Sequence, residues 1–284
     1  MKIVVLGASG LIGSTMYRVL SSESALQVFG TIREDSLRHR FLNKFQKNLI
    51  SAVDLLNHDA LVHLLLKLRP DVIINCAGVT KHLPNSSSVL LALPINALMP
   101  HRIAALCELI GARFIHVSTD CVFLGNRGHY RESDQPDARD VYGQSKALGE
   151  VVMKNSLTIR TSTLGHELTS AHGLLDWFLN QKDVCRGYRN AVFSGLPTVV
   201  LAHVIRDFVL SNDALRGLMH VSAQPINKFN LLQLIAKTYG KIIDIQPDDS
   251  VEIDRSLDGS LFAKVSGFVA PEWPELIQIM FENR

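Results

Sequence analysis

An apolar segment followed by three regularly spaced glycines opens the chain and constrains its fold more than any other feature. Residues 2–6 (KIVVL) predict a buried strand, residues 7–13 (GASGLIG) a glycine turn, and residues 16–20 the apolar part of a helix. In such a unit Gly7 allows the tight turn, Gly10 lets backbone N–H groups approach a pyrophosphate, and Gly13 permits close packing of helix on strand. The sequence therefore predicts a nucleotide-binding α/β fold.

Strand and helix patterns alternate after this unit. We expect further strands at residues 26–32, 49–53, 72–76, 114–118 and 157–160, and helices at residues 60–68 and 92–110. Six strands alternating with helices predict a doubly wound parallel sheet of the Rossmann type, with right-handed crossovers. Ligands of such sheets bind at the carboxyl ends of the strands, where Thr119 and Asp120 are expected.

The pattern loosens beyond about residue 163. Helices are expected at residues 174–179, 199–210 and 231–239, a short strand at residues 218–221, and a last helix whose start is flanked by Pro271 and Pro274. We therefore predict a Rossmann domain over residues 1–162, with returns from about residues 190–225. Residues 163–284 are expected to form mainly a smaller, interleaved substrate lobe.

The composition favours a cytoplasmic enzyme. A net charge of +2 and the lack of Lys/Arg runs argue against nucleic-acid binding. The chain starts directly with a strand, and no apolar run is expected to be long enough to span a membrane. Its four cysteines are scattered without C-x-x-C spacing, and its histidines show no metal-binding spacing, so neither disulfides nor a metal site are expected.

Residues 142–146 (YGQSK) contain the side chains that indicate which reaction the chain would catalyse. Tyr142 and Lys146 are four residues apart and share one helix face, and Thr119 precedes them after a predicted strand. An ammonium one turn from a phenol favours the phenolate and is expected to lower the pKa of Tyr142 toward the working pH. A proton donor, its pKa modulator and a carbonyl-polarising hydroxyl together predict carbonyl reduction.

Several motifs combine with this group. They are the N-terminal glycine turn, residues 75–78 (NCAG), 118–123 (STDCVF), Tyr142 with Lys146, residues 149–150 (GE) and 160–162 (RTS). The combination resembles extended short-chain dehydrogenase/reductases and, within them, the dTDP-4-dehydrorhamnose reductase group, over nearly the whole chain. The resemblance implies hydride transfer from a reduced nicotinamide to a nucleotide-activated keto sugar in surface-polysaccharide synthesis. Whether the chain forms a homodimer stays open.

The same resemblance implies roles for individual residues. Tyr142 would protonate the new alkoxide, Lys146 would hold the nicotinamide ribose, Thr119 would bind the carbonyl oxygen, and Asp120 would orient this network or cap the loop. The implied cofactor-binding residues are Gly7, Ser9, Gly10, Leu11, Ile12, Gly13, Arg33, Asp54, Cys76, Ala77, Gly78, Tyr142 and Lys146.

Two departures from the group's pattern bear on the substrate. Cys121 and Thr163 stand where the rhamnose-type reductases usually carry Tyr and Trp, so an aromatic surface for the sugar is missing. This favours a related substrate, such as a UDP-linked 2-acetamido-2,6-dideoxy keto sugar, over dehydrorhamnose itself. Dehydration is not expected, because Cys121 replaces the acidic residue that dehydratases carry there.

Cys121 also raises an alternative. In GDP-fucose synthases, which are epimerase-reductases, a Cys and a loop His occupy positions comparable to those of Cys121 and His172. A thiolate and an imidazole on opposite faces of the sugar would exchange a proton beside the ketone. The simpler interpretation is a compact core cysteine and a loop histidine.

The cofactor preference depends on the residues after the second predicted strand. Arg33, with Arg38 and Arg40 nearby, offers positive charge for a 2′-phosphate and favours NADPH, although NADH stays open. The simpler interpretation is that Arg33 is an ordinary solvated arginine on the surface.

A second class of function is also open, because the beta subunit of methionine adenosyltransferase, a relative of this family, is a non-catalytic nucleotide-binding regulator. The presence of both Tyr142 and Lys146 favours catalysis.

Overall fold

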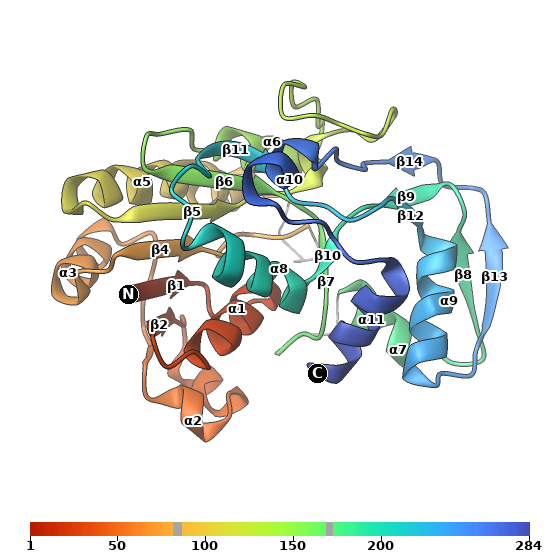
Figure 1. Cartoon of the computed structure of the whole chain (residues 1–284), viewed down its shortest axis with the longest axis horizontal. Coiled ribbons are helices and arrows are strands. Elements are labelled where there is room, and N and C mark those ends of the chain that lie inside the picture. Colours follow the sequence, from red (N-terminus) through yellow and green to blue (C-terminus); the bar gives the residue numbers. More distant parts are fainter. Residues whose placement is uncertain (82–86, 169–172) are drawn as a thin grey trace.

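A seven-stranded parallel sheet forms the larger part of the molecule (Figure 1). The computed structural model describes residues 1–81, 87–168 and 173–284. The strand order is β11-β6-β5-β4-β1-β2-β3, and each neighbouring pair is parallel. The strands are β1 (Lys2–Leu6), β2 (Gln27–Thr31), β3 (Leu49–Ile50), β4 (Val72–Asn75), β5 (Arg113–Val117), β6 (Ser156–Arg160) and β11 (Gly217–His220). The predicted doubly wound parallel sheet is confirmed, and its seventh strand, β11, coincides with the short strand expected at residues 218–221.

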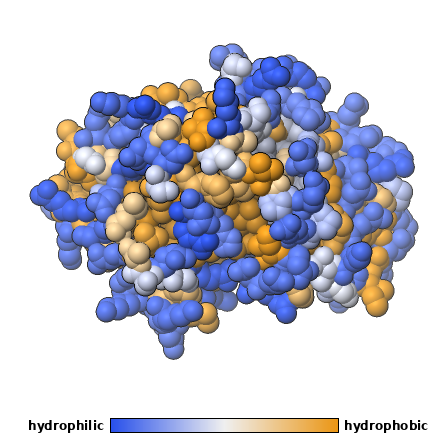
Figure 2. All heavy atoms as spheres, viewed as in Figure 1, coloured by the Kyte–Doolittle hydropathy of each residue, from blue (hydrophilic) through white to orange (hydrophobic). Residues whose placement is uncertain are grey.

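Helices cover both faces of this sheet because its strands are apolar on both sides. Along β1, Ile3 and Val5 belong to one core cluster, whereas Val4 and Leu6 belong to another. The first cluster lies under α1 (Leu11–Ser21) and α8 (Thr198–Val204), and the second lies under α3 (His58–Leu68) and α5 (Met99–Ile110). On the face shown in Figure 2, hydrophobic residues gather over α8 and toward α11 (Trp273–Glu282).

One long helix differs from expectation. The chain is continuously helical from Val89 to Ile110, through α4 (Val89–Ala92), a π-helical turn η2 (Leu93–Leu98) and α5. This 22-residue helix contains an 18-residue stretch with a mean hydropathy of 1.5. By length and composition alone it is apolar enough to cross a membrane, although no such segment was expected from the sequence. Ile103 and Cys107 are fully buried against the sheet. The helix is therefore part of the core of this fold.

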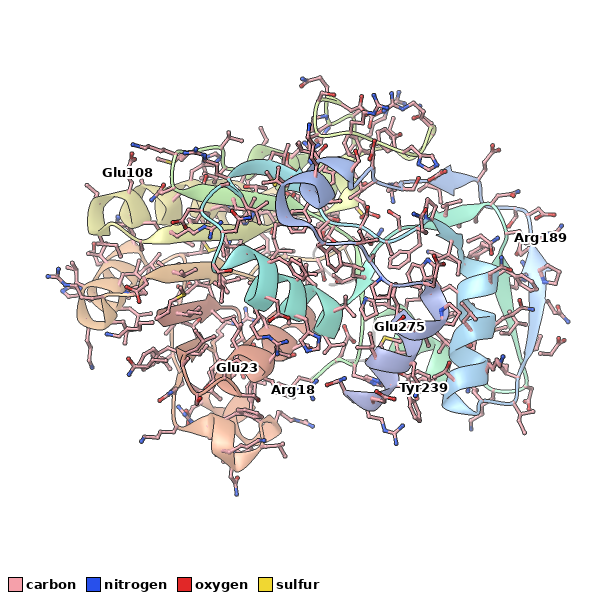
Figure 3. All side chains as sticks on the ribbon, viewed as in Figure 1. Arg18, Glu23, Glu108, Arg189, Tyr239 and Glu275 are labelled. Atoms are coloured by element: carbon pink, nitrogen blue, oxygen red, sulfur yellow. The ribbon has the colours of Figure 1, made fainter. Side chains whose placement is uncertain are left out.

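The second half of the chain builds a lobe beside the sheet. Its strands pair locally: β8 (Val184–Tyr188) with β13 (Asp244–Asp248), β9 (Ala191–Phe193) with β12 (Ile226–Asn227) and β14 (Ile253–Asp254), and β7 (Thr163–Leu164) with β10 (Leu196–Pro197). Its helices include α7 (Leu174–Asn180) and α9 (Lys228–Tyr239), with α10 (Ser260–Ser266) nearer the sheet. Figure 3 marks the extent of the molecule, from Glu108 at the outer end of α5 to Arg189 at the far side of the lobe. The division at residue 162 stays a prediction.

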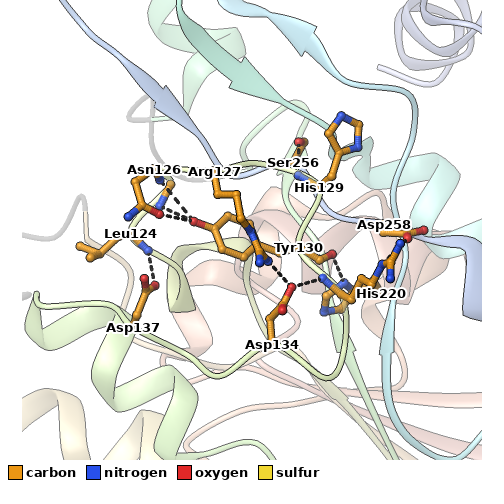
Figure 4. Close-up of polar contacts among 12 residues, drawn as sticks. Leu124, Asn126, Arg127, His129, Tyr130, Asp134, Asp137, His220, Ser256 and Asp258 are labelled. Carbon is orange, nitrogen blue, oxygen red and sulfur yellow. Dashed lines mark hydrogen bonds and ion pairs between the residues drawn. The ribbon is translucent and has the colours of Figure 1, made fainter.

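A loop between β5 and α6 (Val141–Leu148) ties the sheet to the lobe (Figure 4). The Tyr130 N–H donates to Ser256 O at 2.9 Å, and the Asp258 N–H donates to Tyr130 O at 2.8 Å. The Tyr130 ring stacks on Phe123 with centroids 4.1 Å apart. His220 Nδ1 lies 3.0 Å from Tyr130 O. These contacts hold residues 254–258 beside residues 125–130 of this loop.

Candidate active site

The glycine turn after β1 has the predicted form. Gly7 adopts φ +76°, a left-handed conformation that glycine tolerates without strain. A Cβ at Gly13 would lie 2.1 Å from Gly7 O, so the helix–turn contact requires glycine there. Gly10 is the N-cap of α1 and supplies no side-chain cap. The first N–H groups of α1 therefore have the arrangement that binds phosphate at a helix N-terminus.

Helix α6 presents Tyr142 and Lys146. It begins after Asp140, whose carboxylate accepts a hydrogen bond of 2.7 Å from the Gly143 N–H. Lys146 is buried, and its Nζ donates to Val117 O, the last residue of β5, at 2.8 Å. This bond places the ammonium of Lys146 at the carboxyl end of β5, because Val117 ends that strand two residues before Thr119.

Asn96 connects α6 to the loop after β4. Its Oδ1 accepts from the Val79 N–H at 2.8 Å, and its Nδ2 donates to Val79 O at 3.0 Å and to Ser145 Oγ at 3.1 Å. A Cβ at Gly149 would lie 1.8 Å from Asn96 O, so η2 and the end of α6 are in direct contact. No site role was expected for Asn96, because only the folded chain brings it beside Ser145.

Thr119, Asp120 and Cys121 follow β5 as predicted and are all buried. Thr119 Oγ1 donates to Asp120 Oδ1 at 3.1 Å and accepts from the Cys121 N–H at 3.1 Å. Asp120 therefore contacts the hydroxyl that is expected to bind the carbonyl. Burial and the neighbouring Asp120 raise the pKa of the Cys121 thiol, which favours the protonated form.

The expected lowering of the Tyr142 pKa is wrong for this structure. Burial raises the pKa of the Tyr142 phenol above its usual value, Cys121 raises it further, and a hydrogen bond with Thr119 lowers it. Desolvation is the largest cause, and Lys146 is not among the groups that shift this pKa: its Nζ donates to a backbone carbonyl instead. Burial lowers the pKa of Lys146 to about 8, partly offset by Glu150.

A buried ion pair supports the end of α6. Glu150 and Arg160 form two hydrogen bonds of 2.7 Å, and their side chains are 8% and 2% exposed. Ser118 Oγ also donates to Glu150 Oε1 at 2.8 Å. The pair fixes the end of α6 to β6 and to the start of the loop that carries Thr119. Desolvated charges of this kind need each other, because either one alone would be buried without compensation.

Cations gather around Cys121. Lys81 Nζ donates to Cys121 Sγ at 3.5 Å, and Arg255 Nη1 lies 3.9 Å from the same sulfur. Arg255 also donates through Nε to Phe123 O at 2.7 Å. Lys228, the first residue of α9, is within electrostatic reach of Lys81, Cys121 and Arg255. None of these three cations was expected, because they lie far apart in the sequence.

The three arginines after β2 differ in their surroundings. Arg33 is exposed. Arg38 donates to Gln46 O at 2.7 Å and to Leu49 O at 3.1 Å, so it mainly holds the chain between β2 and β3. Arg40 lines a cavity of about 230 Å³ between α1 and the C-terminal helix. Of the three, Arg33 is the nearest in sequence to the end of β2, and its contact with a 2′-phosphate stays a prediction.

The remaining expected site residues lie at the predicted sheet edge or outside the described part. Asp54 is exposed after β3, and its carboxylate accepts from the Leu56 N–H at 2.9 Å. Cys76, Ala77 and Gly78 follow β4. Ser9, Leu11 and Ile12 belong to the glycine turn and the start of α1. His172 lies outside the described residues. Within the described ranges, no group of three His, Cys, Asp or Glu residues is arranged to hold a metal ion.

Comparison with known proteins gives a family match and several structural neighbours. The family described as RmlD substrate binding domain matches residues 1–258. A hypothetical dTDP-4-dehydrorhamnose reductase from Sulfolobus tokodaii is 27% identical, with a TM-score of 0.79, and the alignment covers 96% of this chain and 98% of that one. A dTDP-4-dehydrorhamnose reductase from Bacillus anthracis, in complex with NADP, shares the fold at 22% identity and a TM-score of 0.81, with 99% and 98% coverage.

Curated relatives match over shorter stretches. A probable low-salt glycan biosynthesis reductase of Haloferax volcanii is 33% identical over 152 residues, which are 53% of this chain and 48% of that protein. Methionine adenosyltransferase 2 subunit beta of Bos taurus is 30% identical over 162 residues, 55% of this chain and 44% of that protein. The matches thus span about half the length of these relatives.

Proposed function

Because the chain belongs to the family described as RmlD substrate binding domain, we propose that it is an NADPH-dependent reductase of a nucleotide-activated 4-keto-6-deoxy sugar. The observation that carries the proposal is the convergence of Tyr142, Lys146 and Thr119 at the carboxyl end of β5. Lys146 bonds to Val117 O at 2.8 Å, and the Tyr142 phenol shares a hydrogen bond with Thr119. Proton donor and carbonyl-binding hydroxyl are therefore in contact.

The bound nicotinamide would supply the hydride. The residues of this chain would bind the ketone oxygen and donate a proton to it. Thr119, whose hydroxyl donates to Asp120 in the structure, would turn that hydrogen to the ketone oxygen when the substrate is bound. Tyr142 would transfer its proton to that oxygen as negative charge develops on it. The raised pKa of Tyr142 keeps the phenol protonated until then. The ammonium of Lys146 would stabilise the resulting phenolate.

The cofactor-binding residues support this assignment by their geometry. The uncapped start of α1 and the close Gly7–Gly13 contact fit a pyrophosphate, and the position of Lys146 at the carboxyl end of β5 supports its proposed contact with a nicotinamide ribose. Exposed Arg33 favours a 2′-phosphate and hence NADPH over NADH. A cytoplasmic location fits such substrates and stays a prediction.

The choice of sugar is testable with a panel of substrates. UDP-, dTDP- and GDP-linked 4-keto-6-deoxy sugars would each be incubated with the protein and NADPH, and cofactor absorbance followed. Since Cys121 and Thr163 replace the usual aromatic residues, we expect a UDP-linked 2-acetamido-2,6-dideoxy keto sugar to react faster than dTDP-4-dehydrorhamnose. No NADPH consumption with any keto sugar, by protein that binds NADPH, would contradict the proposed reductase activity.

Epimerisation before reduction is a second candidate, favoured by the contact of Cys121 with the catalytic group. If Cys121 exchanges a proton beside the ketone, substrate incubated in deuterated water with NADP⁺ will gain deuterium at that carbon. Cys121→Ser would abolish the exchange yet keep reduction of a substrate of the right configuration. His172→Gln tests the partner proposed from the sequence. Absence of deuterium uptake by active wild-type protein would leave a plain reductase.

A non-catalytic, nucleotide-binding subunit is a third candidate, because methionine adenosyltransferase 2 subunit beta is among the relatives. The same substrate panel separates this function from catalysis. A regulator would bind the dinucleotide without turnover, and Tyr142→Phe would leave its properties unchanged. The buried, hydrogen-bonded Lys146 and Thr119 favour the enzyme.

A further inference from the structure

A cavity of about 230 Å³ lies between α1 and the C-terminal helix α11, and the proposed reaction gives it no role. It is lined by α1, the chain from Arg40 into α2 (Asn43–Gln46), the loop after β7, the start of α8 and the end of α11. Thr119, Tyr142, Lys146 and the glycines of the turn after β1 are not among its lining residues. The cavity is therefore separate from the group of residues that would reduce the ketone.

Arg18 is the lining residue that points most directly to an anionic ligand. It lies on α1 and is partly buried, and its Nη2 donates to Asn283 O at 2.6 Å, near the end of α11 (Figure 3). A guanidinium carries five N–H donors, and among the described residues this is the one hydrogen bond that the Arg18 side chain makes. Burial lowers the pKa of Arg18, so its charge is partly desolvated. An oxyanion in the cavity would accept hydrogen bonds from the remaining donors.

The other charged side chains of the lining leave room for such an anion. Arg40 is exposed and makes no hydrogen bond or ion pair with any residue that the structure describes. The guanidinium of Arg284 lies over the Phe281 ring, 4.1 Å from its centroid. Glu167 also lines the cavity, but within the described ranges no carboxylate forms an ion pair with Arg18 or Arg40. These two arginines are therefore able to bind an acid group of a ligand.

Apolar side chains complete the lining. Phe41 and Phe45 are each 6% exposed, and both rings meet the Tyr17 ring edge to face, with centroids 5.8 and 6.5 Å apart. Met280 on α11 is also buried. An apolar cavity of about 150 Å³ is large enough to hold benzene. A cavity of about 230 Å³ therefore accommodates a single ring that carries an acid group, but not a dinucleotide.

We propose that this cavity binds a small organic anion, whose acid group contacts Arg18 and Arg40 and whose single ring lies against the two phenylalanines. The site goes beyond the proposed reductase function and does not depend on it. Two sources share the required chemistry: a carboxylic acid and a phosphate ester. Arginine binds either group through paired N–H donors, and burial of the ring adds to the affinity.

Binding of simple probes tests the site without any turnover. Benzoate, phenyl phosphate, benzyl alcohol and inorganic phosphate are each titrated into the protein, and saturation-transfer NMR follows the probe. We expect the aromatic anions to bind about tenfold or more tightly than benzyl alcohol, because the alcohol lacks the charge-assisted contact. Inorganic phosphate should bind more weakly than phenyl phosphate, because it has no ring to bury. The tighter of the two aromatic anions identifies the source of the acid group.

Two variants locate the probe in the cavity. Arg18→Gln should weaken binding of the tighter anion about tenfold or more, whereas Arg102→Gln, exposed on α5, is the control and should bind it like wild type. Because Arg18 also holds Asn283, a second variant tests the site without disturbing that contact. Leu42 lines the cavity and is 65% exposed, so Leu42→Glu should fold normally and repel the anion.

Repeating the titrations in NADP⁺-saturated protein separates this site from the cofactor site. Unchanged affinity of the wild type, with weaker binding by both variants and thermal midpoints like that of wild type, supports the proposal. Failure of the wild type to bind either aromatic anion, equal binding of benzyl alcohol, unchanged binding in either variant, or displacement of the probe by NADP⁺ would overturn it. Turnover is scored separately: a protein that binds the anion but reduces no keto sugar contradicts the proposed function and not this site.

Discussion

Tyr142 is the residue on which the proposed chemistry depends most directly. Tyr142→Phe removes the hydroxyl that would donate the proton. The hydroxyl is expected to contribute much less to cofactor binding than to the transfer of this proton. Turnover should therefore fall by about 10²–10⁴-fold while NADPH affinity changes little. Rates on the best substrate of the panel and a fluorescence titration of NADPH measure the two effects. Tyr188→Phe, on β8 in the lobe, is the control, and wild-type turnover by Tyr142→Phe would refute the assignment.

Arg33 is the residue that separates the two nicotinamide cofactors. Arg33→Ala should weaken NADPH binding by about 1.5–3 kcal/mol and NADH binding far less, because only NADPH offers a 2′-phosphate to a guanidinium. Arg102→Ala, exposed on α5, is the matched control. Both cofactors are titrated into each variant. Equal losses for NADPH and NADH would mean that Arg33 does not read the phosphate.

At the scale of elements, the Glu150–Arg160 pair joins α6 to β6. Glu150→Gln should lower the free energy of unfolding by about 3–5 kcal/mol, because the guanidinium of Arg160 stays buried without its carboxylate. Urea denaturation measures the loss. Glu23→Gln removes a largely solvated partner of Arg206 and should change stability by less than about 1 kcal/mol. Similar losses in the two variants would show that the buried pair adds no special stability.

The elements also show which parts of the fold a sequence reveals. The strands β1 and β4 were predictable because both their faces are buried, which leaves an unbroken apolar run. Strand β13 (DIQPD) was not, since it is polar, contains proline and pairs only with β8. Cys121 was expected at the site from its place after Thr119. The cations around it come from distant segments, and only tertiary contacts bring them together.

At the scale of the whole molecule, His220 lies where the sheet meets the lobe. Burial and Arg160 lower its pKa from 6.5 to about 4. The unfolded chain therefore binds a proton between these pH values that the folded chain does not. Stability is full above about pH 6.5 and falls as the pH drops toward 4, by up to roughly 3 kcal/mol from this residue.

Denaturation at a series of pH values measures this dependence. His220→Gln should be less stable at neutral pH, because contacts of the imidazole with Tyr130 O and Arg160 are lost, but its stability should fall less steeply toward pH 4. His58→Gln, at an exposed position, should keep the wild-type slope. An unchanged slope in His220→Gln would assign the acid sensitivity to other groups.

The place of β11 in the sheet has a consequence for how the protein is made. This strand pairs with β6, yet it is encoded far downstream, after much of the lobe. Until residues 217–220 leave the ribosome, a nascent chain carries β6 as an open edge whose backbone groups are free to pair with other chains. Prematurely terminated chains ending near residue 162 should therefore aggregate during synthesis, although they contain the whole glycine turn and helix α6.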